Sequence, residues 1–206
     1  WSQVYPTPLV PTAAANLPNG QVVYWSANQR FRFKGPTGQT ATAMFDPTTG
    51  QSTEQVIQHT GHDMFCPGTA TLEDGRIMIT GGSNAGAVTM YDPATNQWTK
   101  EPQMGVPRGY HSMTVLHDGS VFTVGGSWSG GRGGKYGEIW DPDQNRWHPL
   151  TNITTPPMET VDNEGIFRED NHMWLFQSPR RRIFQAGPSR QMHWIDIRST
   201  DGKGRT

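Results

Sequence analysis

The chain has 206 residues, and its 17 basic and 18 acidic side chains leave a formal net charge of −1 at pH 7. This near-neutral charge gives no support for a nucleic-acid partner or a membrane surface, and no apolar run is long enough to cross a bilayer. The 24 glycines and 16 prolines are spread among aromatic and β-branched residues, which indicates short strands joined by tight turns.

The first predicted sheet unit begins at Asn19-Gly20, a turn signal that precedes the β-rich run at 21–25. A long insert covers residues 28–38, and a second β-rich run ends at Asp46-Pro47. Proline cannot donate a ladder hydrogen bond, so this pair predicts the end of a strand.

The second and third units repeat the same landmarks in the same order: Asp-Gly, Gly-Gly, aromatic-Asp-Pro and Trp. They lie at 74–75, 81–82, 91–93 and 98, and again at 118–119, 125–126, 140–142 and 147, so the first two recur after 44 residues and the last two after 49. Asp-Gly between β-rich runs predicts a two-residue hairpin with a type I′ turn. Gly-Gly predicts a sharp turn or a close backbone approach, so each unit should be a small antiparallel sheet.

A weaker fourth unit follows, with runs at 165–168, 173–176, 183–188 and 192–197 and a polar tail at 198–206 that resembles a loop. Repeats of this length with Gly-Gly after the second strand are typical of kelch propeller blades, which close rings of four to eight. We therefore predict an all-β fold in which residues 1–206 form about four blades of a propeller. A complementary polypeptide segment is expected to supply the remaining blades.

Cys66 is the only cysteine, which excludes an internal disulfide and a cysteine-based zinc site. One interpretation is a buried small hydrophobe. However, Cys66 and Tyr110 each precede the first strand of consecutive units, 44 residues apart. Corresponding positions of neighbouring blades lie side by side, so the two side chains are predicted to point at the same place.

Trp128 lies 18 residues after Tyr110, in the glycine-rich stretch at 125–134. Such a stretch offers the indole little to pack against locally. The ring is therefore expected to have a partner from elsewhere, either a neighbouring blade or a functional site.

Several of these segments resemble the galactose oxidase family of fungal copper-radical oxidases; they are residues 62–68, 108–110, 125–131, 170–172 and 184–189. The resemblance implies a seven-bladed kelch propeller in which Cys66 is bonded through a thioether to Tyr110, a copper ligand. Trp128 resembles the indole that covers this thioether at the substrate site. Phe33 resembles the family's aromatic residue at the substrate pocket.

The resemblance also implies an activity: a primary alcohol, such as a galactose-type sugar, and O₂ become an aldehyde and H₂O₂. One copper ion and the Cys66–Tyr110 radical would be the cofactors, and the protein would be secreted. The family's other copper ligands and its C-terminal domain are not assigned to this chain. Residues 110–112 mimic the axial Tyr-His motif, but the 44-residue spacing favours the cross-linked tyrosine, and His111 should then face away from the metal.

A different class of function is also open. Kelch repeats occur in non-catalytic binding modules, because a fold does not determine a function. In that case Cys66 would be a packed thiol, and the loops would bind a protein or a glycan.

Overall fold

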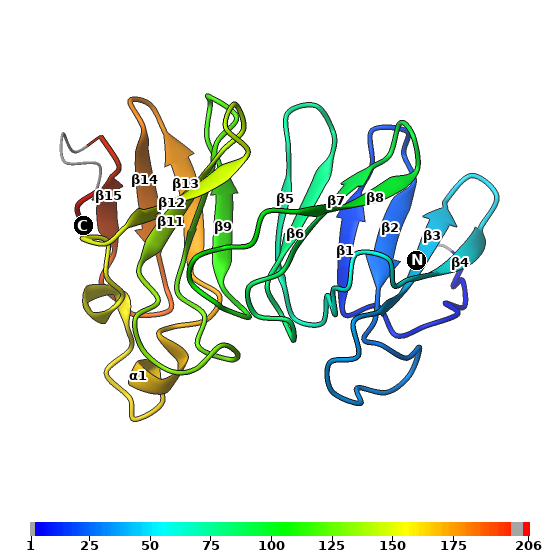
Figure 1. Ribbon diagram of the computed structural model, residues 1–206, viewed down its shortest axis with the longest axis horizontal. Helices are drawn as coiled ribbons and strands as arrows, with labels where there is room; N and C mark the ends of the chain where they lie inside the picture. The colour runs from blue at the N-terminus through cyan, green and yellow to red at the C-terminus, as the bar shows by residue number, and fades with distance from the viewer. Residues whose placement is uncertain (1–2, 199–203) are drawn as a thin grey trace.

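The computed structural model describes residues 3–198 and 204–206, and almost all of its regular structure is β-strand. Four antiparallel sheets follow one another along the chain, and Figure 1 shows them side by side with the first and last at opposite ends of the row. The strands are β1 (Ala13–Asn16), β2 (Val22–Trp25), β3 (Thr40–Asp46) and β4 (Gln51–Ile57) in the first sheet; β5 (Gly68–Thr71), β6 (Ile77–Thr80), β7 (Val88–Asp92) and β8 (Gln97–Glu101) in the second; β9 (Ser112–Val115), β10 (Val121–Val124), β11 (Gly137–Asp141) and β12 (Arg146–Leu150) in the third; and β13 (Trp174–Ser178), β14 (Arg182–Ala186) and β15 (His193–Asp196) in the fourth. The predicted all-β fold of about four sheet units is confirmed.

The turns at the Asp-Gly pairs differ from the predicted type I′ turn. Leu72 N–H donates to the Arg76 carbonyl at 2.8 Å, and Gly75 N–H donates to the Leu72 carbonyl at 3.0 Å, so the turn has three residues. Within it only Gly75 has a positive φ, +87°. The Asp74 carboxylate accepts the Arg76 N–H at 3.0 Å, which stabilises a turn closed by a left-handed glycine. The type I′ prediction is therefore wrong, although the turn lies where it was expected.

The Gly-Gly pairs are sites of close backbone approach, as predicted. Gly81 and Gly82 have φ of +64° and +86°, and a Cβ on either would collide with a backbone carbonyl, that of Arg108 or that of Phe65. Gly82 N–H also donates to the Arg108 carbonyl at 3.1 Å. The Gly-Gly pair therefore lets the segment around Arg108, which leads into the next sheet, pack closely against it.

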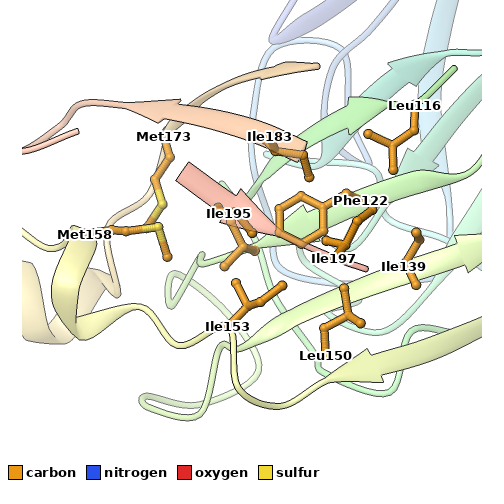
Figure 2. Close-up of a cluster of buried hydrophobic side chains, with 11 residues drawn as sticks. Leu116, Phe122, Ile139, Leu150, Ile153, Met158, Met173, Ile183, Ile195 and Ile197 are labelled. Carbon is orange, nitrogen blue, oxygen red and sulfur yellow. The ribbon is translucent and has the colours of Figure 1, made fainter. Parts of the chain in front are cut away.

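Most of the core lies between successive sheets, and a smaller cluster of Leu9, Tyr24, Ala41 and Ala43 lies on the first sheet. One cluster joins β2 to β6 and β7, a second joins the second sheet to the third, and a third joins the third sheet to the fourth. Figure 2 shows this last cluster, in which side chains of β10 and β11 meet those of β14 and β15. Each sheet is thus held by apolar contact with its neighbour, as in a propeller.

Two segments of the fourth unit differ from the prediction. Residues 165–168 form the short helix α1 (Gly165–Arg168) instead of a strand, after the 3-10 turn η1 (Pro156–Met158). The Asp162 carboxylate accepts the N–H groups of Glu164 and Gly165 and so starts the helical turn.

The tail at 198–206 was expected to be a loop, and residues 199–203 lie outside the described part of the chain. Arg205 and Asp196 exchange both of their backbone hydrogen bonds at 2.8 Å, so the last residues pair with β15. In the described ranges, no helix has the length and apolar character needed to span a membrane.

Candidate active site beside Cys66 and Tyr110

Cys66, Tyr110 and His172 occupy equivalent places, each two residues before the first strand of its sheet. Their φ angles are +59°, +57° and +61°, a region that side chains with a Cβ rarely adopt. Tyr110 N–H donates to the Cys66 carbonyl at 3.0 Å, and His172 N–H donates to the Tyr110 carbonyl at 2.9 Å. This backbone ladder sets the three side chains next to one another.

The Cys66 thiol and the Tyr110 hydroxyl share a hydrogen bond, and Cys66 is buried. That hydrogen bond and burial raise the pKa of Tyr110 to about 12. Burial raises the pKa of the Cys66 thiol, and the hydrogen bond with Tyr110 opposes this shift. At neutral pH the pair is therefore a neutral thiol against a neutral phenol.

Trp128 lies against the Tyr110 ring, with centroids 5.2 Å apart, and 38% of it is exposed. Its ring is also 5.8 Å from Phe65 and 6.3 Å from Phe33, which itself stacks on Phe65 at 4.6 Å. The structure thus brings all four residues singled out from the sequence into one cluster with Phe65. This cluster forms an apolar, partly exposed surface beside the thiol–phenol pair.

Two members of this cluster were missed from the sequence. The His172 ring packs on Tyr110 with centroids 4.7 Å apart, and burial lowers the pKa of His172. His172 has the same place two residues before β13 as Cys66 and Tyr110 have before β5 and β9, an equivalence that only the structure shows. Phe65 lies within the segment 62–68, and its position next to Cys66 was the available signal.

Arg108, two residues before Tyr110, is fully buried. Its guanidinium donates to the carbonyls of Gly125 at 2.9 Å and Tyr136 at 2.8 Å, and it pairs with Glu138 at 2.8 Å. Arg108 therefore fastens the segment before Tyr110 to the third sheet. Burial lowers the pKa of Arg108, and the carboxylate of Glu138 opposes this shift.

His111 faces away from the aromatic cluster, as expected. Its side chain is buried, its Nε2 lies 2.7 Å from the Thr80 hydroxyl, and burial lowers its pKa well below the usual value. Within the described ranges, no group of three His, Cys, Asp or Glu side chains could hold a metal ion. Tyr110 is the one copper ligand that the resemblance implied in this sequence, and its phenol lies in the aromatic cluster.

Comparisons with known proteins identify similar sequences and a similar fold. Residues 107–154, which include the third sheet, match the model of the Kelch motif. Galactose oxidase of Gibberella zeae is 43% identical over 206 residues, covering 99% of this chain and 30% of that protein. An F-box/kelch-repeat protein of Arabidopsis thaliana is 27% identical over 140 residues, covering 63% of this chain and 38% of that protein.

A solved structure, described as a novel fungal alcohol oxidase with catalytic diversity among the AA5 family in complex with copper, is also similar. It superposes with a TM-score of 0.86 at 34% identity and covers 96% of this chain and 41% of that one. The chain thus spans less than half the length of these oxidases. The identity to galactose oxidase over nearly the whole chain, the shared sheets and the kelch motif identify this chain as a member of the galactose oxidase family.

Proposed function

We propose that this chain is part of a secreted copper-radical oxidase that converts a primary alcohol or sugar and O₂ into an aldehyde and H₂O₂. The observation that carries the proposal is the Cys66 thiol hydrogen-bonded to the Tyr110 phenol beside Trp128. The same pair fits a redox cofactor made from side chains.

Cofactor formation would join the sulfur of Cys66 to the ring carbon next to the Tyr110 hydroxyl. The S–H and C–H bonds break, one C–S bond forms, and two electrons and two protons pass to O₂, which becomes H₂O₂. The sulfur then donates electron density to the ring, which stabilises a phenoxyl radical. The neutral, hydrogen-bonded state of the pair holds both reacting groups in contact before the bond forms.

The described residues fit one corner of a copper site. The Tyr110 hydroxyl is a hard oxygen donor beside the thiol, and its raised pKa means that a cation must replace its proton. Bound copper could accept one electron and the radical a second one, so that together they could take two electrons from an alcohol. The other ligands would come from residues beyond this group.

Trp128 and Phe33 are proposed to face the substrate. Both rings are partly exposed, 38% and 48%, while their inner sides pack with Phe65 beside the thiol–phenol pair. Trp128 would exclude water from the Tyr110 radical. Phe33 would offer an apolar wall for the carbon face of a sugar or alcohol.

A complementary polypeptide segment with further kelch sheets is proposed as a partner, within a seven-bladed propeller. The outer face of the fourth sheet exposes Trp174, Phe176 and Trp194 by 68%, 55% and 56%. In the first three sheets, the equivalent position is covered by the apolar face of the next sheet. The regular packing therefore predicts one more sheet on this face. The relatives are longer than this chain and so contain further residues that could form such a sheet.

Mass spectrometry of the whole protein that contains these residues tests the proposal. After copper and air, the intact mass should fall by two hydrogens, and the Cys66 peptide should stay joined to the Tyr110 peptide under reduction. Cys66→Ser and Tyr110→Phe should each abolish the linkage. A Cys66 thiol that remains fully alkylatable after copper and air contradicts the proposal.

A peroxide-coupled screen of galactose, raffinose, glycerol, benzyl alcohol and methylglyoxal would identify the substrate class. It also separates the enzyme from the alternative, a kelch module that binds a protein or glycan. The similarity to an F-box/kelch-repeat protein supports a shared kelch fold but not a shared binding role. That protein is less identical to this chain than galactose oxidase is, and it matches less of the chain. A cross-linked protein that yields peroxide from any of these compounds excludes a purely binding role.

A further inference from the structure

The stretch at 127–134, which carries Trp128, has little structure of its own. Half of its residues are glycines, and Gly130, Gly131, Gly133 and Gly134 all have positive φ. Glycine populates many backbone states, so such a stretch does not hold one shape without outside contacts. The position of the indole therefore depends on what fastens the stretch.

Lys135, directly after this stretch, is 1% exposed. Its ammonium group donates to the carbonyls of Ser129 at 3.1 Å and Gly130 at 3.2 Å, and to that of Pro107. Its side chain therefore folds back beneath the glycine-rich stretch. The three donors of an ammonium group match these three acceptors.

The backbone of Lys135 is fixed as well. Its N–H donates to the Glu169 carboxylate at 2.8 Å, and its carbonyl accepts the Gly125 N–H at 3.0 Å. The base of the stretch is thus closed, and the ammonium group starts from a rigid point. Long, flexible lysine side chains lose much entropy when they are ordered, and a fixed backbone reduces what remains to be ordered.

Loss of hydration and the nearby charge of Arg108 both disfavour the burial of Lys135 in its charged form. Arg108, a second buried cation, faces it, and its own partner is Glu138. Glu169 is the opposing carboxylate, and burial lowers the pKa of Lys135 to about 8. Burying an ammonium group is costly unless it is hydrogen-bonded, and the three carbonyl acceptors offset this cost for Lys135.

The three carbonyls belong to two segments that meet at Trp128. Ser129 and Gly130 follow the indole, whereas Pro107 precedes Gly109, over which the indole lies. A Cβ on Gly109 would be 2.7 Å from Cε3 of Trp128, and one on Gly130 would collide with Pro107. The ammonium group thus ties the segment that carries Trp128 to the segment that carries Tyr110.

We infer that Lys135 is a positioning residue that holds Trp128 over the Cys66–Tyr110 pair by joining the 129–130 and 107 carbonyls. The reason for holding the indole in place rests on the proposed function, in which the indole covers a radical. The joining of the two segments itself does not need copper. It can therefore be measured separately.

Limited trypsin digestion of the whole protein, without copper, tests the joining. Arg132 is an exposed cleavage site within the glycine-rich stretch, and Arg180 is an exposed site in the turn between β13 and β14. Lys135→Met should raise the rate of cleavage after Arg132 at least about tenfold relative to that after Arg180, because it removes three charged hydrogen bonds. Lys100→Met, on the exposed side of β8, should leave the ratio unchanged.

Fluorescence reports on the indole itself. The signal of Trp128 is obtained by subtracting the spectrum of Trp128→Phe, in the wild-type background and in the Lys135→Met background. Its emission should shift to the red and its quenching by acrylamide should rise at least about twofold in Lys135→Met, because the ring leaves its packed position. Lys135→Gln, which keeps an amide donor, should lie between the two.

The outcomes separate the inference from the proposed function. If the wild-type protein forms the thioether but Lys135→Met changes neither the Arg132 cleavage ratio nor the Trp128 signal, the inference is wrong. If both signals change but the wild-type protein never forms the thioether, Lys135 still positions Trp128 and the proposed oxidase is wrong. A Lys135→Met protein that loses its overall unfolding transition is replaced by Lys135→Gln, whose unchanged Arg132 ratio and Trp128 signal would also overturn the inference.

Discussion

Tyr110 donates its backbone N–H to the carbonyl of Cys66 at 3.0 Å, and both residues have φ close to +60°. The left-handed backbone turns each side chain out of its strand direction toward the other. A residue with a Cβ is about 1 kcal/mol less stable in this region than glycine. The thiol–phenol pair is thus held by strained backbone, which is common at functional sites.

The strained backbone at Cys66 predicts that a glycine variant is more stable than an alanine variant, the reverse of the usual order in a strand. Cys66→Gly should be more stable than Cys66→Ala by about 1 kcal/mol, because only glycine adopts this φ freely. Neither variant can form a thioether, so the comparison is independent of copper. Denaturant unfolding measures both, and Thr99 in β8 is the matched control, where the glycine variant should be less stable than the alanine variant. Equal stability of the two Cys66 variants would contradict the strain.

The fold could be predicted from the sequence because its landmarks act locally. An Asx-Gly pair predicts a turn from its own residues alone. A Gly-Gly pair predicts a close backbone approach, although it does not identify the segment that approaches. The turn type could not be predicted, since it depends on whether Leu72 pairs across a two-residue or three-residue loop. The helix α1 was missed because Ile166 and Phe167 form an apolar pair that resembles a strand but is largely exposed.

The site was only partly predictable, for a related reason. Cys66 and Tyr110 could be aligned because their units share a 44-residue spacing. His172 could not, because it follows Tyr110 by 62 residues, after a long insert that includes η1 and α1. Lys135 leaves no local pattern, since its partners at Pro107 and Ser129 are brought to it only by the folded chain.

The buried ion pair of Arg108 and Glu138 predicts a large loss of stability when one partner is removed. Arg108→Met should lower the free energy of unfolding by about 3–5 kcal/mol, because it leaves the Glu138 carboxylate buried without its cation. Urea unfolding measures this loss. Arg76→Met is the control, since Arg76 pairs with Asp74 at the surface and should change stability by less than about 1 kcal/mol.

A second variant distinguishes the charge from simple packing. Arg108→Met combined with Glu138→Gln should recover part of the loss, because the unpaired charge is gone while an amide oxygen still accepts the Gly105 N–H. A double variant no more stable than Arg108→Met alone would show that the packing of the guanidinium dominates.

His62 predicts a loss of stability in mild acid. Its Nε2–H donates to the Gly81 carbonyl at 2.7 Å and its Nδ1 accepts from the Thr89 hydroxyl at 2.9 Å, which is the neutral form. Burial lowers the pKa of His62 from 6.5 to about 4. The unfolded chain therefore binds a proton that the folded one does not, so this stabilisation is fully present above about pH 6.5 and is lost as the pH falls toward 4.

The expected size is a fall of about 3 kcal/mol in the free energy of unfolding between those pH values. His62→Gln should be less stable at pH 7 but should lose less stability on acidification. Its slope of unfolding free energy against pH should be smaller by the uptake of about one proton. Urea unfolding at a series of pH values measures both slopes. Identical slopes in the two proteins would show that His62 does not take up the proton.

The contacts of Asp63 predict how the insert at 28–38 is held. Its carboxylate, 1% exposed, accepts the N–H groups of Thr37 and Gly38, in the insert that carries Phe33. Asp63→Ala should therefore release the insert and raise trypsin cleavage after the exposed Arg32 at least about tenfold, because two charged hydrogen bonds are lost. Asp63→Asn keeps an acceptor oxygen and should give a smaller increase. If the insert were held by the stacking of Phe33 on Phe65 instead, Phe33→Ala would open it and Asp63→Ala would not, so the two variants together decide which contact places Phe33 beside Trp128.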